Sequence, residues 1–159
     1  MAFTHALGSG VPDGFEPHFR RSPVTDPWEP LYSRRSEGQV EIGLRLREAH
    51  CNSRGFVHGG VISALADNAM GLTFHAARAL ALGAHAADAR AVTMTLTIDF
   101  VATAKVGEWL QITPRVLRAG QATGFVDALV TSEDQLVARA SAIFRAIESS
   151  RAPRTETKP

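Results

Sequence analysis

The residues most able to do chemistry lie in one short stretch, "NSRGFVHGGVISALADNAMGL", at positions 52–72. Its second half is apolar enough to predict a helix buried on most sides, yet Asp67 stands in the middle of it. An ionised carboxylate is costly to bury unless it is paired or hydrogen-bonded. Small residues at helical spacing would leave room for a substrate beside Asp67, namely Ser63, Ala64 and Gly71. They would equally permit a close helix–helix contact, or a carboxylate bound to loop backbone, and the sequence leaves these alternatives open.

The predicted helix begins at Gly59 and Gly60. Glycines let a substrate approach the backbone closely, and the first N–H groups of a helix have no intrahelical partner. Together with the helix dipole, these donors would stabilise an oxyanion developing on an ester or thioester carbonyl. A tight loop-to-helix turn would also explain the two glycines. Their position after His58 and before Asp67 makes the chemical interpretation stronger than a lone Gly-Gly would.

Two polar side chains precede the glycines. His58 could be a general base or a metal ligand, but such a histidine more often orders its loop by bonding backbone groups, and we favour that role. Asn52 could reach a reacting carbonyl or a water molecule, although an Asx-turn is the better prediction from sequence alone. The spacing of His50, Cys51 and His58 matches no standard zinc pattern, so we expect no metal. Cys51 has no activating neighbours in the sequence, and we do not expect it to be a nucleophile.

The rest of the sequence predicts the elements that hold these groups. Apolar alternation in "GQVEIGLRLREAH" predicts a strand, and residues 59–82 are too long and apolar for anything but a helix. Strand-like runs follow at 91–101, 108–118, 122–132 and 135–147, and Pro114 suggests an edge or a bulge in the second. In the first run, Thr93 alternates with apolar residues together with Thr95, Thr97 and Asp99. The order of one strand, one buried helix and a four-stranded meander predicts an α+β fold, with an antiparallel sheet of about five to six strands wrapped around one long central helix.

Composition sets the wider limits. A chain of 159 residues fits one domain, and a net charge of +1 gives no reason to expect nucleic acid or an anionic membrane as a partner. We expect an irregular proline-rich arm at 1–30 with a short helix near "DPWEPLY", a single ordered domain at 31–148 and a disordered tail at 149–159. Polar residues within 59–83 argue against a membrane span. The single cysteine and the absence of a recognisable signal peptide indicate a cytoplasmic setting.

The stretch at 52–72 resembles the signature of the hotdog-fold acyl-CoA thioesterases, specifically the phenylacetate-pathway (PaaI-like) type. That signature is an Asn, a Gly, the run His-Gly-Gly and then a helical Asp followed by a small or polar residue. Here it is met by Asn52, Gly55, His58, Gly59, Gly60, Asp67 and Asn68. "AVTMTLTIDFVATAKVGEWL" resembles the family's next strand and turn, and "VLRAGQATGFVDALVTSEDQLVARASAIFRA" its last two strands. The similarity covers roughly residues 31–147.

The resemblance implies hydrolysis of an acyl-CoA thioester to free acid and CoA. Asp67 would be the general base that activates water or, as a second option, the nucleophile. The backbone N–H groups at Gly59 and Gly60 would polarise the thioester carbonyl, with Asn52 assisting there or holding the water. Thr93 would sit near the water, and His58 would mainly shape the loop. No metal or redox cofactor would be needed, because CoA is part of the substrate.

Substrate contacts and assembly also follow from the resemblance. Met70 and Phe74 could line an acyl tunnel or simply pack, and Arg118 is our candidate for the CoA phosphates. Two subunits would pair their sheets edge to edge with the active site at the interface, and two such dimers would form a tetramer. Two other functions stay open. A hotdog hydroxyacyl dehydratase or hydratase would need a His–acid pair, whereas a non-catalytic acyl-CoA-binding module would bind the ester without turnover.

Overall fold

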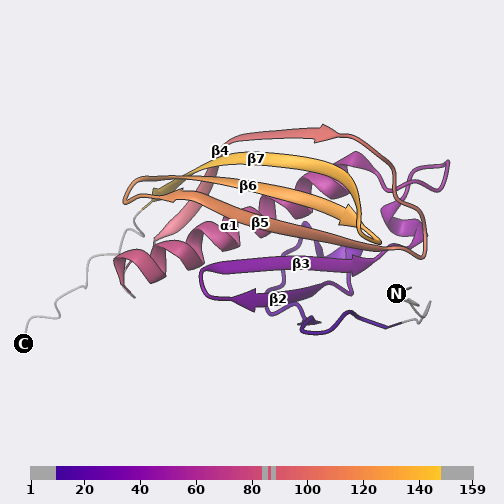
Figure 1. Cartoon of the computed structure of the whole chain (residues 1–159), viewed down its shortest axis with the longest axis horizontal. Helices are drawn as coiled ribbons and strands as arrows, with labels where there is room; N and C mark the ends of the chain where they lie inside the picture. The colour runs from indigo at the N-terminus through magenta and orange to yellow at the C-terminus, as the bar shows by residue number, and fades with distance from the viewer. Residues whose placement is uncertain (1–9, 84–85, 87–88, 148–159) are drawn as a thin grey trace, which may run out of the picture.

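A computed structural model describes residues 10–83, 86 and 89–147 of the chain. One long helix, α1 (Gly59–Leu82), packs against one face of a seven-stranded antiparallel sheet with strand order β1-β2-β3-β5-β6-β7-β4 (Figure 1). The strands are β1 (Glu16–Pro17), β2 (Tyr32–Ser36), β3 (Gln39–Arg45), β4 (Arg90–Phe100), β5 (Trp109–Ala119), β6 (Thr123–Ser132) and β7 (Gln135–Ile147). The predicted α+β fold is confirmed, although the sheet has seven strands rather than five or six. The predicted tail at 149–159 lies outside the described residues.

Helix α1 forms where the sequence predicts it. Its apolar residues recur at helical spacing and fill the core against the sheet: Val61, Ile62, Leu65, Ala66, Ala69, Met70, Leu72 and Phe74. Gly83 ends the helix with φ 92°, a conformation that glycine adopts at little cost. Asp67 and Asn68 are only half-buried, so the helix is not enclosed on every side. No helix in the described part of the chain is long and apolar enough to cross a membrane.

The sequence predicts that β4 is the first strand of a four-stranded meander. In the structure, β4 instead lies at the far edge of the sheet. Strands β5, β6 and β7 do form a meander, and β4 pairs with β7, from Arg90 opposite Ile147 to Phe100 opposite Ala138. The chain therefore crosses the whole width of this meander between the end of β4 and the start of β5 (Figure 1). Alternation predicts which face a side chain occupies but not which strand lies beside it, so the sequence could not reveal this edge position.

The arm predicted to be irregular contributes to the sheet. Strand β1 pairs with β2, and a short 3-10 helix, η1 (Asp26–Trp28), lies within the predicted "DPWEPLY" segment. The Phe15 ring meets the Trp109 ring edge-on, with 5.3 Å between ring centroids. Gly43 makes space for this contact, because a Cβ atom there would lie 2.3 Å from the Trp109 ring. The arm thus covers the outer face of the sheet, the face away from α1, over β3 and β5.

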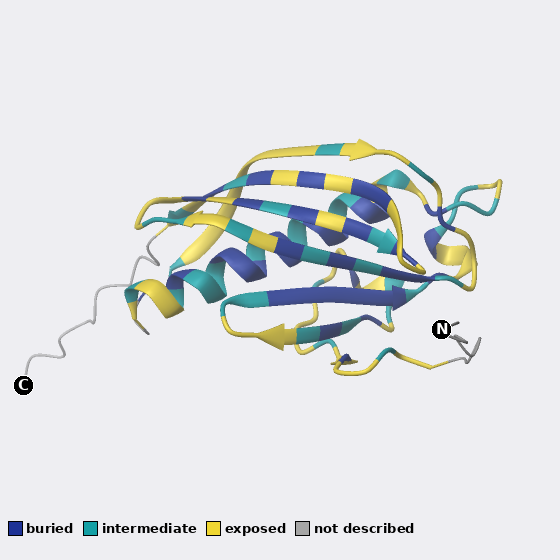
Figure 2. Ribbon diagram, viewed as in Figure 1, coloured by how far each residue is buried: buried dark blue, intermediate teal, exposed yellow. Residues whose placement is uncertain are grey.

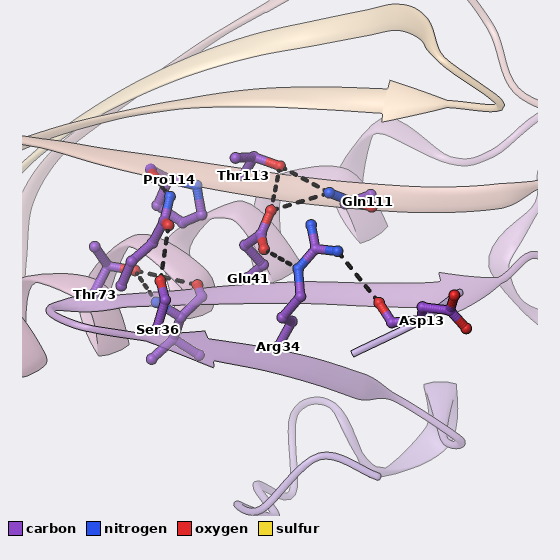
Figure 3. Close-up of polar contacts among 10 residues, drawn as sticks. Asp13, Arg34, Ser36, Glu41, Thr73, Gln111, Thr113 and Pro114 are labelled. Atoms are coloured by element: carbon purple, nitrogen blue, oxygen red, sulfur yellow. Dashed lines mark hydrogen bonds and ion pairs between the residues drawn. The ribbon is translucent and has the colours of Figure 1, made fainter. Parts of the chain in front are cut away.

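On this outer face, the buried carboxylate of Glu41 joins three strands (Figure 3). Arg34 of β2 donates to one carboxylate oxygen at 2.5 Å, and from β5 Gln111 and Thr113 donate to the other at 3.0 and 2.9 Å. Arg34 also donates to the carbonyl of Asp13, 3.4 Å away, which brings in the arm. Burying a carboxylate is tolerable here because all of these donors satisfy it.

Pro114 marks the place where β3 and β5 separate. Strand β5 lies between β3 and β6, so it is not an edge, and the register shift in β5 falls between Val116 and Arg118 instead. However, β3–β5 pairing stops at Ile112, and Pro114 has no N–H to donate. The N–H and C=O of Val40 bond to the Thr73 hydroxyl of α1, at 3.0 and 3.1 Å (Figure 3). The helix thereby satisfies backbone groups that the proline leaves without a partner strand.

Candidate active site

The structure brings together Asp67 of α1 and Thr93 of β4. The Thr93 hydroxyl donates a hydrogen bond to Asp67 Oδ1 over 2.7 Å. Asp67 is half-buried and Thr93 is exposed, so the pair lies open at the β4 edge of the molecule. No partner for the second carboxylate oxygen is found within the described residues. The carboxylate is therefore oriented by a hydroxyl and keeps an oxygen free to accept a proton.

A β-bulge turns Thr93 toward the helix. Strict alternation, as expected from the sequence, would place Thr93 on the same face as Thr95. Instead, Thr93 pairs with Phe144 and Thr95 pairs with Ile143, which leaves Met94 without a partner on β7. Because the extra residue shifts the alternation, Thr93 shares the face of the core residue Phe144 and can reach Asp67. The predicted alternation is wrong at this point, and the error falls on a candidate site residue.

At the start of α1, the imidazole of His58 is the N-cap of the helix. Its Nδ1 accepts a hydrogen bond from the Gly60 N–H over 2.9 Å, while the His58 carbonyl accepts from Val61 and Ile62 at 3.0 and 3.3 Å. The loop-ordering role favoured for His58 therefore agrees with its contacts. The Gly60 N–H is already engaged, whereas the N–H of Gly59 bonds to no other described residue. Since that N–H is opposite the His58 carbonyl across a trans peptide, it points out of the helix end.

The loop before His58 is closed by its own hydrogen bonds. Asn52 Oδ1 accepts from the backbone N–H groups of Arg54 and Phe56, at 2.9 and 3.3 Å, so the Asx-turn interpretation agrees with the geometry. The side-chain NH2 of Asn52 donates to no other described residue. Single bridges join Cys51 to Val57 and Phe56 to Lys105, next to β5. The loop thus presents a fixed turn, and the Asn52 amide and the Gly59 N–H are among its donors that bond to no other described residue.

Comparison with known proteins shows the family to which the chain belongs. The family model named "Thioesterase superfamily" matches residues 54–139, which contain the Gly59 turn, Asp67 and Thr93. The chain belongs to the thioesterase superfamily. It is 38% identical over 135 residues to "Putative esterase PA0474" of Pseudomonas aeruginosa, a match that covers 84% of this chain and 96% of that protein.

Solved structures of other proteins show the same fold. A Streptococcus mutans protein solved with bound acetyl CoA is 26% identical and has a TM-score of 0.66, covering 84% of this chain and 98% of that one. The Escherichia coli PaaI protein of the phenylacetic acid degradation operon has a TM-score of 0.63 at 23% identity, covering 75% and 87% of the two chains. At that level of identity the second likeness shows the fold alone. It agrees with the resemblance seen in the sequence.

Within this thioesterase, the predicted acyl-binding residues Met70 and Phe74 are core side chains. Both are fully buried, and the Phe74 ring stacks on Phe144 with 5.7 Å between centroids. Their contacts are those of packing, and a role in substrate binding stays a prediction. Arg118 is exposed on β5, and its guanidinium forms no hydrogen bond or ion pair with another described residue. A role for it in binding CoA phosphates is likewise a prediction.

The sequence analysis expects neither a nucleophilic Cys51 nor a metal held by the loop that contains it. Burial raises the pKa of the Cys51 thiol, and the nearby charge of Glu48 raises it further, so the thiolate needed for nucleophilic attack is disfavoured. Among residues 10–83, 86 and 89–147, no three His, Cys, Asp or Glu side chains gather closely enough to hold a metal ion.

Two residues near the site of this thioesterase were not predicted to belong to it, although His50 was considered as a metal ligand and rejected. The ring of Phe100, at the end of β4, lies 3.1 Å from where a Cβ on Gly59 would be, so it packs directly against the helix start. His50 is buried and bonds the backbone amide of His58 through its carbonyl, at 2.9 Å. The sequence does show that β4 ends in an aromatic residue, which could have pointed to Phe100. The role of His50 is visible only from its contact with His58 in the structure.

Proposed function

We propose that the protein hydrolyses acyl-CoA thioesters, releasing the free acid and CoA. Asp67 takes a proton from a water molecule, and the water oxygen forms a bond to the thioester carbonyl carbon. The Gly59 N–H donates to the resulting oxyanion, with the Asn52 amide as a second donor. The tetrahedral intermediate then collapses, the carbon–sulfur bond breaks, and CoA leaves as the thiolate, which is reprotonated. These steps require no metal or redox cofactor.

The observation that carries this proposal is the Asp67–Thr93 hydrogen bond. A hydroxyl that donates to a carboxylate stabilises its ionised form and fixes its rotamer, which a general base needs. Membership in the thioesterase superfamily supports a thioester as the bond attacked, and the related S. mutans structure with acetyl CoA supports a CoA ester. Hydrolysis needs a hydrogen-bond donor for the oxyanion as well as a general base. The Gly59 N–H is the candidate for that donor.

In one subunit, the Asp67 carboxylate and the Gly59 N–H cannot both act on the same thioester group. Gly59 and Asp67 are eight residues apart on α1, which at about 1.5 Å per residue separates them by about 12 Å along the helix. The Gly59 N–H also points out of the helix end, away from Asp67. Since attacking water and oxyanion donors must all meet one carbonyl group, we infer that the donor comes from a second copy of the chain.

The β4 edge is the surface suited to that second copy. All of β4 is exposed except the half-buried Ile98, and no strand among residues 10–83, 86 and 89–147 pairs with one side of its backbone. Apolar side chains line it, among them Val92, Met94, Leu96 and Phe100. An open edge of this kind invites pairing with another strand. Antiparallel pairing of two β4 strands would give a dimer with Asp67 of each subunit close to the interface, and two such dimers would form the tetramer expected for the family.

Thiol release from a panel of acyl-CoAs, from acetyl to long-chain and phenylacetyl, tests the proposal with the wild type and Asp67→Asn. Loss of the general base should lower kcat by about 10²–10⁴-fold. Asp99→Asn is the matched control, because Asp99 is also an aspartate of the β4 side but pairs with Arg139 at 2.8 Å on the outer face. Reactions without substrate correct for the reaction of Cys51 with the thiol dye.

Each outcome has a definite meaning. Turnover that is lost in Asp67→Asn and kept in Asp99→Asn, with both variants folded, supports hydrolysis with Asp67 as the base. No turnover of any CoA ester by the wild type contradicts the proposal. Tight binding of intact acyl-CoA in that case would indicate a non-catalytic binding module, and water addition to an enoyl-CoA would indicate a hydratase.

A further inference from the structure

The buried imidazole of His50 joins the N-terminal arm to the loop that carries the candidate oxyanion donor. His50 is 1% exposed. Its Nδ1 accepts a hydrogen bond from the Arg47 N–H over 2.9 Å, and its Nε2 lies 3.0 Å from the carbonyl oxygen of Trp28. A nitrogen that accepts carries no proton, so the Nε2 must be the protonated nitrogen and donates to Trp28. The contacts therefore define a neutral ring in one tautomer.

The backbone of the same residue holds the start of α1. The His50 carbonyl accepts from the His58 N–H over 2.9 Å, next to the bridge between Cys51 and Val57. His58 in turn caps the helix and fixes the peptide that carries the Gly59 N–H. The ring of His50 thus bonds the arm and the short η2 helix (Glu48–His50), while its carbonyl bonds the residue that sets the direction of the Gly59 N–H.

We propose that His50 is the positioning residue of the oxyanion turn: its ring clamps the loop 50–58 to the arm at Trp28, and its carbonyl thereby holds the Gly59 N–H in the direction that catalysis needs. This inference rests on the proposed function, because it assigns a role in the same site. His50 does not touch the substrate and acts only through His58. The arm acquires a role as the support behind the turn, in addition to covering the sheet.

Protonation would break this clamp. A second ring N–H at Nδ1 would face the Arg47 N–H, and two donors cannot bond to each other. Burial lowers the pKa of His50, and the charge of Arg47 lowers it further, while the bond to the Trp28 carbonyl opposes the shift. The charged residues on the two short helices and their flanks are Asp26, Glu29, Arg47 and Glu48. The clamp is therefore intact at neutral pH and is lost as the pH falls through the lowered pKa.

Three substitutions separate the two ring contacts. Glutamine places an amide NH2 where Nε2 was, so His50→Gln can keep the bond to Trp28. Asparagine places an oxygen near the former Nδ1, so His50→Asn can keep only the bond from Arg47. His50→Phe fills the space and keeps neither. Glu41→Gln is the control for loss of stability alone, because Glu41 lies in the hydrogen-bond network of β3 on the outer face, away from the turn.

The expected order of kcat is wild type, His50→Gln, His50→Asn and His50→Phe, with KM little changed. His50→Phe should lose about 10–100-fold, the size expected when a small displacement misplaces a catalytic group. Glu41→Gln should keep the wild-type kcat below its melting temperature. The acid limb of kcat/KM should contain a component in the wild type that is missing in His50→Gln.

A second readout does not depend on catalysis. Exchange of the His58 backbone N–H with solvent, followed by NMR in the full-length protein, should be faster in His50→Phe than in Glu41→Gln. Wild-type kcat in folded His50→Phe, or unchanged protection of that N–H, would overturn the inference, and so would equal kcat in the Gln and Asn variants. If the wild type hydrolyses no acyl-CoA, the proposed function fails, while the exchange measurement still decides whether His50 holds the turn. If His50→Phe does not fold, the Gln and Asn pair carries both tests.

Discussion

Strands β3 and β4 lie toward opposite edges of the same sheet, and they differ in how far the rest of the chain covers them. Every residue of β3 is buried or half-buried, whereas every residue of β4 is exposed apart from the half-buried Ile98 (Figure 2). Both strands carry alternating apolar residues, so composition does not account for the difference. The arm, β1 and β2 continue the sheet beyond β3 and cover its outer face, while nothing in the described chain continues the sheet beyond β4.

The difference separates stability from function. The β3 side holds the buried Glu41 network and the contact of Phe15 with Trp109, which serve the fold of a single chain. The β4 side holds Thr93, bonded to Asp67, and an unpaired edge that a second copy can complete. We therefore expect loss of the Glu41 network to change the free energy of unfolding, and loss of the Asp67–Thr93 contact or of the open β4 edge to change turnover or assembly.

The largest effect is expected from a charge on the open edge. Leu96→Lys places a cation at a β4 position that is 36% exposed in the single chain, and in a two-fold strand pair it would add a cation from each subunit. Sedimentation should show a monomer. Turnover should fall by at least the 10²–10³-fold typical of losing one oxyanion donor, because the Gly59 N–H of the second copy would be absent.

Leu129→Lys is the matched control for that variant. Leu129 is 53% exposed on β6, inside the sheet rather than at its edge. It should keep the wild-type dimer and its turnover. A dimeric, active Leu96→Lys protein would refute the assignment of β4 as the pairing edge.

A smaller effect is expected from removing the hydroxyl that orients the base. Thr93→Val keeps the shape of the side chain but leaves Asp67 without its donor. Hydrogen bonds to charged groups are worth about 1.5–3 kcal/mol, so kcat should fall roughly 10–100-fold while the dimer persists. Thr93→Ser keeps the donor and should recover most of the rate. Equal rates for the valine and serine variants would show that the bond has no catalytic role.

The same comparison shows what the sequence could predict. Strand β3 and helix α1 have strong periodic patterns: α1 spans the predicted residues 59–82, and β3 forms within the predicted segment 38–50 but ends at Arg45. The apolar alternation of β5, β6 and β7 was also sufficient to predict these strands and their bounds to within a residue. The short strands β1 and β2 were missed because Glu16, Pro17 and the polar run of β2 have no alternation of their own, and they form only by pairing with β3 through β2.

For the candidate site, local chemistry could be predicted and distant pairing could not. The Asx-turn at Asn52 and the capping role of His58 depend on neighbours within a few residues, so the residue types were sufficient. The approach of Thr93 to Asp67 depends on a bulge at Met94 and on β4 pairing with β7. Neither follows from alternation, and the family resemblance alone pointed to Thr93.

On the β3 side, Glu41→Gln should lower stability with little change in turnover. Glutamine removes the charge and one acceptor, so the partners Arg34, Gln111 and Thr113 lose part of their bonding. Arg34 is partly exposed and can be hydrated instead, so the cost should be about 1–3 kcal/mol rather than that of a fully buried ion pair. Urea unfolding measures the change. A fall in kcat under conditions where the variant is fully folded would contradict the separation of the two sides.

The smallest effect is expected from mild acid, and it should also fall on the arm. Burial lowers the pKa of His18, with Arg20 lowering and Glu29 raising it, and neither ring nitrogen has a hydrogen-bond partner within the described residues. Because the unfolded chain then binds a proton more readily than the folded one, stability falls as the pH drops below the ordinary histidine value of about 6.5. Backbone hydrogen exchange between pH 7 and pH 5.5 should therefore accelerate more in β1 and β2 than in β6 and β7, and His18→Phe should reduce that difference. Equal acceleration in both regions would mean that acid acts on the fold as a whole, and that the arm is no weaker than the sheet it covers.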